Sequence, residues 1–79
     1  MTNAKPDVKC NLQTILDERK GTNREISIRQ LAEQSGLKFE TVRRLYHNDT
    51  RRYQRESIAA ICVTLGVGID ELLTLVSDE

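Results

Sequence analysis

The stretch "IRQLAEQSGLKFETVRRL", residues 28–45, constrains the fold of this chain more than any other part of its sequence. It holds two short amphipathic segments whose apolar residues recur at helical spacing, and the two are joined at Gly36. Ser27 is suited to begin the first helix, and Gly36 is suited to end it in the left-handed conformation. Ala32 lies four residues before the glycine, and its small side chain lets two helices cross closely. The stretch therefore predicts a helix-turn-helix.

The same spacing predicts helices elsewhere, and three further segments carry it: residues 12–20, 58–65 and 69–76. Asn11 is a suitable N-cap for the first of them, and "GVG" at 66–68 separates the last two. No hairpin signal is visible, although Val8 and Cys10 alternate with polar residues. The expected fold class is all-α, a compact five-helix domain over residues 8–79. Residues 1–7 are expected to form a flexible tail.

A chain of 79 residues buries only about 60% of the surface that its unfolded form exposes, so every apolar helix face is needed for the core. The expected core consists of Leu31, Ala32, Val42, Leu45, Ile58, Ile61, Leu65, Ile69 and Leu72. The two cysteines, Cys10 and Cys62, are far apart in sequence and have neither zinc-ligand nor disulfide spacing. They are expected to act as small buried apolar groups.

The net charge is zero, but the charges are unevenly distributed. Residues 38–55 carry six Lys or Arg and two acids, a balance of +4, whereas residues 56–79 carry five acids and no Lys or Arg. The basic part therefore follows the turn at Gly36. A basic cluster on one element suits a phosphate backbone, although a solvated surface face is the commoner cause of a charge run.

The helix that follows Gly36 presents a polar side. At 100° per residue, Phe39, Leu45 and Tyr46 fall within about 60° of Val42, which is expected to face inward. Glu40, Arg44 and His47 gather on the opposite side, and Arg43 flanks them. This is the stripe that a recognition helix would present to the major groove.

Several function classes find no support in the sequence. No Ser, Cys or His has an activating partner in its sequence context, and no Gly-rich loop can hold a phosphate, so the chain is not expected to be an enzyme. No cofactor or metal site is expected, because His47 has no neighbour at ligand spacing. No apolar run approaches the length of a membrane span, and no secretory signal is visible, so a cytoplasmic protein is expected.

From about residue 11 to residue 76, the chain resembles the Xre family, the phage-repressor (Cro-like) type of helix-turn-helix protein. The resemblance rests on "SIRQLAEQSGL", on "TVRRL", on Asn48 just after it, and on "SIAAICVTLGVGIDELL". It implies a lambda-repressor-like DNA-binding fold and a bacterial or phage-encoded transcriptional regulator. Such a protein binds double-stranded operator DNA, usually as a homodimer, with its third helix in the major groove of a palindromic or pseudopalindromic site.

The resemblance also implies roles for individual side chains. Those expected to read bases are Phe39, Glu40, Arg43 and Arg44. Those expected to contact the DNA backbone are Ser27, Arg29, Lys38, Thr41, His47, Asn48, Arg51, Arg52 and Arg55. Lys38 stands where the family often has a Ser or Thr N-cap, and Glu40 stands where an uncharged polar residue is frequent.

Two of these residues also have a purely structural interpretation. Arg44 either reads a guanine, as Arg does most often in specific contacts, or only pairs with Glu40 one turn earlier. Phe39 either contacts a thymine methyl or packs on the core. The alternative function for the whole chain is an antitoxin-like or adaptor module that binds a protein partner, with DNA binding secondary.

A homodimer is expected to form through a C-terminal helix that includes the stretch "DELLTLVSDE". One recognition helix reads only a few base pairs, so pairing with a second copy adds specificity. The expected interface residues are Leu72, Leu75 and Val76. Leu75 is the apolar side chain left over once Ile69, Leu72, Leu73 and Val76 face inward.

Overall fold

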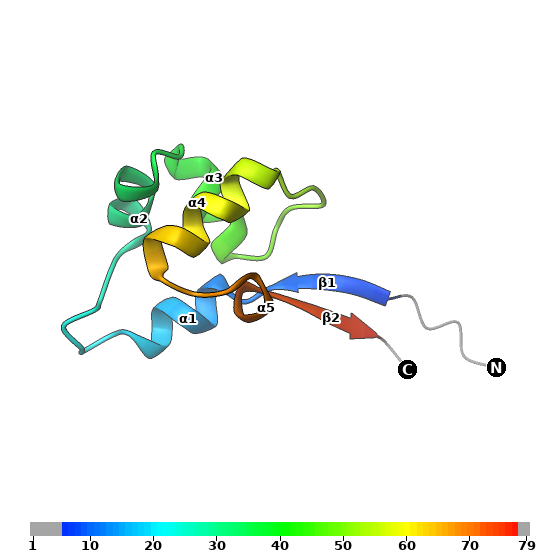
Figure 1. Ribbon diagram of the computed structural model, residues 1–79, viewed down its shortest axis with the longest axis horizontal. Helices are drawn as coiled ribbons and strands as arrows, with labels where there is room; N and C mark the ends of the chain where they lie inside the picture. Colours follow the sequence, from blue (N-terminus) through cyan, green and yellow to red (C-terminus); the bar gives the residue numbers. More distant parts are fainter. Residues whose placement is uncertain (1–5, 78–79) are drawn as a thin grey trace.

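The computed structural model describes residues 6–77, which form five helices and one two-stranded antiparallel sheet (Figure 1). The elements, in chain order, are β1 (Pro6–Cys10), α1 (Leu12–Glu18), α2 (Ile28–Ser35), α3 (Phe39–Tyr46), α4 (Arg55–Leu65), α5 (Ile69–Leu72) and β2 (Leu73–Ser77). The five helices were predicted, but the all-α fold class was only partly right, because the two ends of the chain form a sheet. Within the described residues, no helix is both long and apolar enough to cross a membrane.

Local signals place α2 and α3. Ser27 caps α2 by accepting a hydrogen bond from the Gln30 backbone N–H at 3.1 Å, and the Gln30 side chain accepts one from the Ser27 N–H at 2.9 Å. Gly36 ends α2 with φ of 76°, as predicted for a left-handed exit. Lys38 occupies the N-cap position of α3 without a side-chain hydrogen bond to the helix. The helix-turn-helix is therefore present at the predicted residues.

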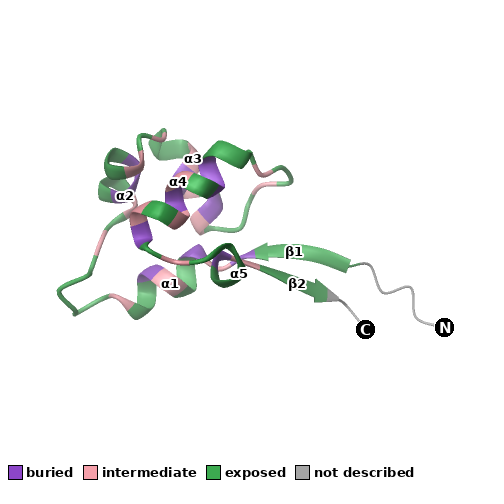
Figure 2. Ribbon diagram, in the orientation of Figure 1, coloured by how far each residue is buried: buried purple, intermediate pink, exposed green. Residues whose placement is uncertain are grey.

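The core lies where α1 to α4 meet, and the helix faces that turn inward are buried (Figure 2). Its buried apolar residues are Cys10, Leu12, Leu16, Leu31, Ala32, Val42, Leu45, Ile58, Ile61, Leu65 and Leu72. Eight of the nine predicted core residues are among them. The prediction was wrong for Ile69, which is 61% exposed because α5 is a single turn whose first residue stays at the surface.

The C-terminal segment differs most from the prediction. A helix was expected to continue through Val76, but α5 ends at Leu72 and the chain continues as β2. β2 pairs with β1 so that Cys10 lies opposite Leu73 and Val8 lies opposite Leu75. Val76 and Thr74 are β-branched and fit a strand better than a helix. Pairing with β1, which is distant in sequence, therefore favours the strand conformation of this segment over the helical one.

Asn11 joins the start of the helical body to this sheet. It occupies the N-cap position of α1, as predicted, but its side chain makes no capping hydrogen bond. Its backbone N–H donates to the Leu72 carbonyl at 2.7 Å, and its side-chain amide donates to the Glu71 carbonyl at 3.2 Å and to the Thr74 hydroxyl. Asn11 therefore fixes the point at which both ends of the chain leave the helices.

Two further predictions fail in this region. Pro6 and Asp7 belong to β1 and not to a tail; residues 1–5 of the predicted tail lie outside the described residues. Leu72 is fully buried, so it cannot contribute to a dimer interface, and the helical face that was to contain Leu75 and Val76 does not exist.

Candidate nucleic-acid interface

α3 lies on the outside of the helical body and divides its side chains as predicted. Val42 and Leu45 are buried against the core, which fixes the rotation of the helix. Glu40 and Arg44 are exposed on the other side, and Arg43 is half-buried beside them. Three charged side chains are thus presented together on the surface that a helix-turn-helix turns toward DNA.

These three side chains form one ion-paired cluster. The Arg43 Nε donates to a Glu40 carboxylate oxygen at 3.1 Å, and its Nη2 donates to the other oxygen. The Arg44 Nε approaches the second oxygen at 3.4 Å. The hydrogen bond from Arg43 lowers the pKa of Glu40, and Glu40 in turn raises the pKa of Arg43. One carboxylate therefore orients two arginines and offsets part of their charge.

The sequence allowed a Glu40–Arg44 pair one turn apart, and the structure contains it. The closer partner is nevertheless Arg43, three residues along the helix. Both spacings bring side chains together on a helix surface, so the sequence could not rank them. Arg44 keeps most of its donors available, because only its Nε is engaged by Glu40.

Phe39 lies at the start of α3 and is 41% exposed. The Arg29 guanidinium of α2 stacks over its ring, 5.1 Å from the centroid, in cation–π geometry. The pair holds the first turn of α3 against α2. Phe39 therefore packs on the Arg29 side chain and also keeps part of its ring at the surface. Neither of the two predicted roles, contact with a thymine methyl or packing on the core, describes it alone.

The remaining residues expected to contact the DNA backbone fall into two groups. The first group lies at the helix-turn-helix itself: Ser27 at the cap of α2, Arg29, Lys38 at the turn and half-buried Thr41. The second group follows α3 and is exposed: His47, Asn48, Arg51, Arg52 and Arg55. His47 packs edge-on against the Tyr46 ring at 5.1 Å. Along the chain, Thr41 lies within the Glu40–Arg43–Arg44 cluster, and the other members of the two groups flank it.

Asn48 has a structural role that the sequence did not reveal. It is the only non-glycine residue among those described that has a positive φ, 56°. Its side-chain oxygen accepts a hydrogen bond from the Cys10 N–H at 3.0 Å, across 38 residues of sequence. The residue therefore turns the chain out of α3 and also holds β1 against it.

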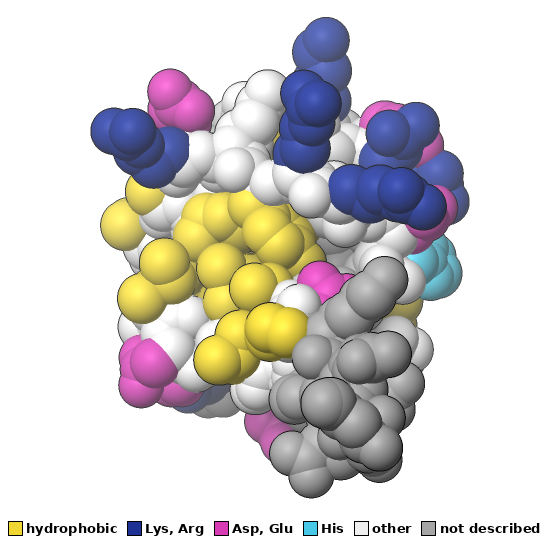
Figure 3. Space-filling view, turned by 90° about the vertical axis from the view of Figure 1, so that its right-hand side faces the viewer, with side chains coloured by type: hydrophobic (Ala, Val, Ile, Leu, Met, Phe, Trp, Pro, Cys, Tyr) yellow, Lys and Arg dark blue, Asp and Glu magenta, His cyan; other side chains and the backbone are white. Residues whose placement is uncertain are grey.

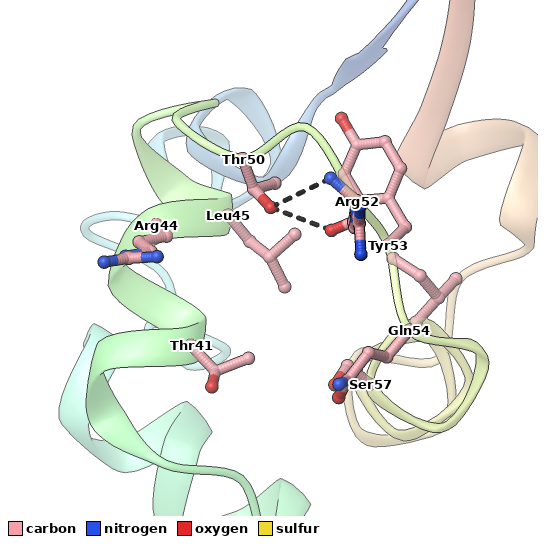
Figure 4. Close-up of a pocket in the computed structure, with 9 residues that line it drawn as sticks. Thr41, Arg44, Leu45, Thr50, Arg52, Tyr53, Gln54 and Ser57 are labelled. Carbon is pink, nitrogen blue, oxygen red and sulfur yellow. Dashed lines mark hydrogen bonds between the residues drawn. The ribbon is translucent and has the colours of Figure 1, made fainter.

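A pocket of about 180 Å³ lies between α3 and the start of α4 (Figure 4). Thr41 and Arg44 come from α3, whereas Thr50, Arg52 and Gln54 come from the segment that leads into α4. The Thr50 hydroxyl donates to the Arg52 carbonyl at 2.8 Å and accepts from the Arg52 N–H at 3.3 Å, so the two residues are joined within the loop. Cations and hydroxyls around an open pocket suit a phosphate oxygen.

Thr50 and Gln54 were not among the predicted site residues. Both are polar, and both adjoin residues that were predicted, Arg51 and Arg55. Their position in the sequence was the signal that could have identified them. Both lie in the segment that leads into α4, and this segment borders the same surface as the first turn of that helix.

Comparison with known protein families shows the family to which this chain belongs. The family model for the Cro/C1-type HTH DNA-binding domain matches residues 11–78. The chain belongs to this family. Searches of curated proteins and of solved structures gave no match. The Cro/C1-type match confirms the resemblance drawn from the sequence, and it supports a DNA-binding regulator. In the structure, α2 and α3 with the turn at Gly36 lie within the matched residues.

Proposed function

We propose that this Cro/C1-type protein is a sequence-specific transcriptional regulator that inserts α3 into the major groove of a palindromic or pseudopalindromic operator and binds there as a homodimer. The observation that supports the proposal most directly is the exposed Glu40–Arg43–Arg44 cluster. It projects from the recognition helix of a DNA-binding family, on the side opposite the buried Val42 and Leu45.

Within this proposal, the base-reading residues are Phe39, Glu40, Arg43 and Arg44. Arg44 is the strongest candidate for a guanine, because its two terminal nitrogens are available for the bidentate contact that Arg makes with guanine O6 and N7. Glu40 can accept a hydrogen bond from a cytosine amino group. The carboxylate also holds Arg43 and Arg44 beside it, so that both are oriented before DNA arrives.

The backbone-contacting residues surround this cluster. Arg51 and Arg52 precede α4, and Arg52 lines the pocket that also contains Thr41 and Arg44. A phosphate held there would set the depth at which α3 enters the groove. Affinity that does not depend on sequence would come from these cations, because neutralised phosphates release their counterions. Base contacts would supply the specificity.

The test begins with selection of bound sequences from random double-stranded DNA, followed by titrations at several salt concentrations. Arg44→Ala is expected to cost about 1 to 3 kcal/mol on the selected site and to relax the preference at one base position. Arg52→Ala is expected to weaken binding to all sequences alike and to reduce the salt slope by roughly one. Arg24→Ala, in the α1–α2 loop, is the matched control and should change neither quantity.

Two results would refute the proposal. If no sequence is enriched over random DNA, the protein does not recognise an operator. If Arg44→Ala leaves discrimination between sites unchanged, α3 is not the base-reading element in the manner assigned.

A further inference from the structure

Phe39 is an exposed apolar side chain beside the charged cluster of α3. It is the first residue of this helix and is 41% exposed. Among the described residues, the other exposed large hydrophobic side chains lie in β1, β2, α4 and α5, away from the helix-turn-helix. Val63, Ile69 and Leu73 of these elements line one pocket of about 500 Å³, and Figure 3 shows hydrophobic side chains gathered on that side. Within residues 27–46, all of which the structure describes, Phe39 is the one exposed large hydrophobic residue.

Arg29 holds the Phe39 ring from α2. Its guanidinium lies over the ring, 5.1 Å from the centroid. Arg29 is exposed at the second position of α2, and it forms no ion pair within the part of the chain that the structure describes. A guanidinium that stacks on a ring keeps its N–H donors in its own plane, at the edge of the stack. The stack therefore covers one face of the ring and leaves the rest of it, with the Arg29 donors nearby, at the surface.

The position of Phe39 on α3 places it where a recognition helix meets bases. The N-terminal residues of such a helix contact base edges in the major groove, and Lys38 before Phe39 is still extended. At 100° per residue, Phe39 lies about 60° from the buried Val42 and about 40° from Arg43. It therefore borders the inward side of the helix and shares its outward side with the arginine one turn later.

The chemistry of the ring limits what it can receive in the major groove. Phe39 has no hydrogen-bond donor or acceptor, whereas every base pair presents polar groups there. The apolar group among them is the C5-methyl of thymine. A ring placed against a polar edge leaves that edge without a partner, which costs free energy, whereas a methyl group gains from leaving water. The ring therefore favours a pyrimidine with a C5-methyl and disfavours the other bases.

We infer that Phe39 and Arg29 together form a receptor for the C5-methyl group of a pyrimidine in the operator, and that Arg29 is the residue that positions the ring. Thymine carries this methyl, and 5-methylcytosine carries the same group on the same ring atom. The inference deepens the proposed function and rests on it, because the ring meets a base only if α3 enters the major groove. It adds an apolar determinant to the polar contacts assigned to Glu40 and Arg44.

Arg29 can hold the ring and a phosphate at the same time. The stack uses the face of its guanidinium, and a phosphate oxygen would use the N–H donors at its edge. A phosphate bound there would anchor the guanidinium and, through it, the Phe39 ring. Lysine at this position would keep the positive charge without the planar group that stacks. Arg29 therefore acts on the methyl through Phe39, and the two contributions of its side chain can be separated.

The experiment starts from the operator sequence that selection yields. Each thymine in turn is replaced by deoxyuridine, which differs from thymidine only in lacking the C5-methyl, and dissociation constants are measured by fluorescence anisotropy at one salt concentration. For the wild type, one thymine in a half-site should respond with a dissociation constant about three- to fivefold higher, as expected for one buried methyl group. The remaining thymines serve as internal controls.

Two variants assign the response to residues, with circular dichroism to verify folding. Phe39→Ala should bind the thymine and deoxyuridine operators with equal affinity, because the ring that contacts the methyl is absent. Arg29→Lys should keep the salt dependence of the wild type but lose most of the difference between the two operators. Val63→Thr is the matched control: it changes an exposed apolar residue on α4 and should keep the full difference.

A second series distinguishes the two sources of the methyl. The base pair contacted by Phe39 is made T·A, C·G or 5-methylcytosine·G in otherwise identical DNA. Methylation of the cytosine should tighten binding by the wild type about three- to fivefold and should leave binding by Phe39→Ala unchanged. If the thymine operator binds more tightly than the methylated one, thymine is the natural ligand; the opposite order identifies methylated DNA.

Three results would overturn the inference: a wild type that responds neither to deoxyuridine nor to cytosine methylation, a Phe39→Ala that keeps the response, or an Arg29→Lys that keeps it in full. The wild-type series needs no altered protein, so it remains decisive if Phe39→Ala fails to fold. A protein that selects an operator but ignores the methyl leaves the proposed function intact and overturns this inference alone. A protein that selects no sequence refutes the proposed function, and this inference falls with it.

Discussion

Asn48 allows a stability prediction in which two physical effects can be separated by choice of substitution. The residue has φ of 56°, and its side chain accepts the N–H of buried Cys10 at 3.0 Å. Asn48→Ala removes the acceptor and also places a Cβ-bearing residue that lacks a polar side chain in the left-handed region. Asn48→Gly removes the acceptor alone, because glycine adopts this φ without strain. Asn48→Asp keeps both an acceptor and a residue tolerant of positive φ.

The magnitudes follow from these contributions. Leaving the Cys10 N–H without its partner should cost about 1 to 3 kcal/mol. The left-handed conformation adds roughly 1 kcal/mol for alanine. Asn48→Ala is therefore expected to lower the free energy of unfolding by about 2 to 4 kcal/mol, and Asn48→Gly by about 1 kcal/mol less than that. Asn48→Asp should stay nearest the wild type.

Urea unfolding followed by circular dichroism measures these differences, provided that the slope with denaturant is the same for all four proteins. If Asn48→Ala and Asn48→Gly lose the same free energy of unfolding, the left-handed backbone conformation at this position does not contribute to the cost of the alanine substitution. Losses below about 0.5 kcal/mol in both, the range of ordinary surface substitutions, would refute the role of the hydrogen bond to Cys10. DNA affinities of these variants must be measured well below their melting temperatures, because Asn48 is also proposed to contact the DNA backbone.

Three further predictions concern separate parts of the molecule. Ala32→Leu should force α2 and α3 apart and cost about 1 to 3 kcal/mol through overpacking, seen as a lower melting temperature; an unshifted melt would mean that Ala32 is not at the crossing. Glu40→Gln should release Arg43 and Arg44 from their shared carboxylate, so that binding to random DNA becomes tighter and steeper in salt dependence; unchanged salt titrations would contradict this. Burial raises the pKa of the Cys10 thiol, so the unfolded chain loses this proton at a lower pH than the folded protein does. The free energy of unfolding should therefore fall as the pH rises above about 8.5, the usual pKa of a cysteine thiol. Urea melts from pH 7 to 10 should show a smaller fall in Cys10→Ala than in the wild type, and equal falls would contradict the assignment.

The helix-turn-helix could be predicted because its signals are local. Ser27 and Gly36 each fix one end of α2 through the conformation of the backbone within a few residues. The rotation of α3 followed from the spacing of Val42 and Leu45, and so did the exposure of Glu40 and Arg44. A helix of two turns with one apolar stripe has only one way to bury it.

The sheet could not be predicted in the same way. Ile69, Leu72, Leu73 and Val76 follow helical spacing as well as any segment of the chain, and no short-range signal contradicts it. The strand conformation of β2 depends on β1, about 65 residues earlier in the sequence. Strand preference depends on such neighbours more than helix preference does. The contacts of Asn11 could not be predicted for the same reason. The local sequence predicted that its side chain caps α1, but the side-chain amide donates to the Glu71 carbonyl and to the Thr74 hydroxyl of β2.

The contacts of Asn48 and Tyr53 connect the candidate DNA surface with the two-stranded sheet. Asn48 ends the recognition helix segment and binds the backbone of Cys10 in β1, and Tyr53, after the arginine-rich loop, binds the backbone of Val8. β1 is in turn paired along its length with β2. The C-terminal end of α3 is therefore connected to both ends of the chain through this sheet. The left-handed turn at Asn48 makes the connection, because the same residue turns the chain out of the recognition helix and holds β1.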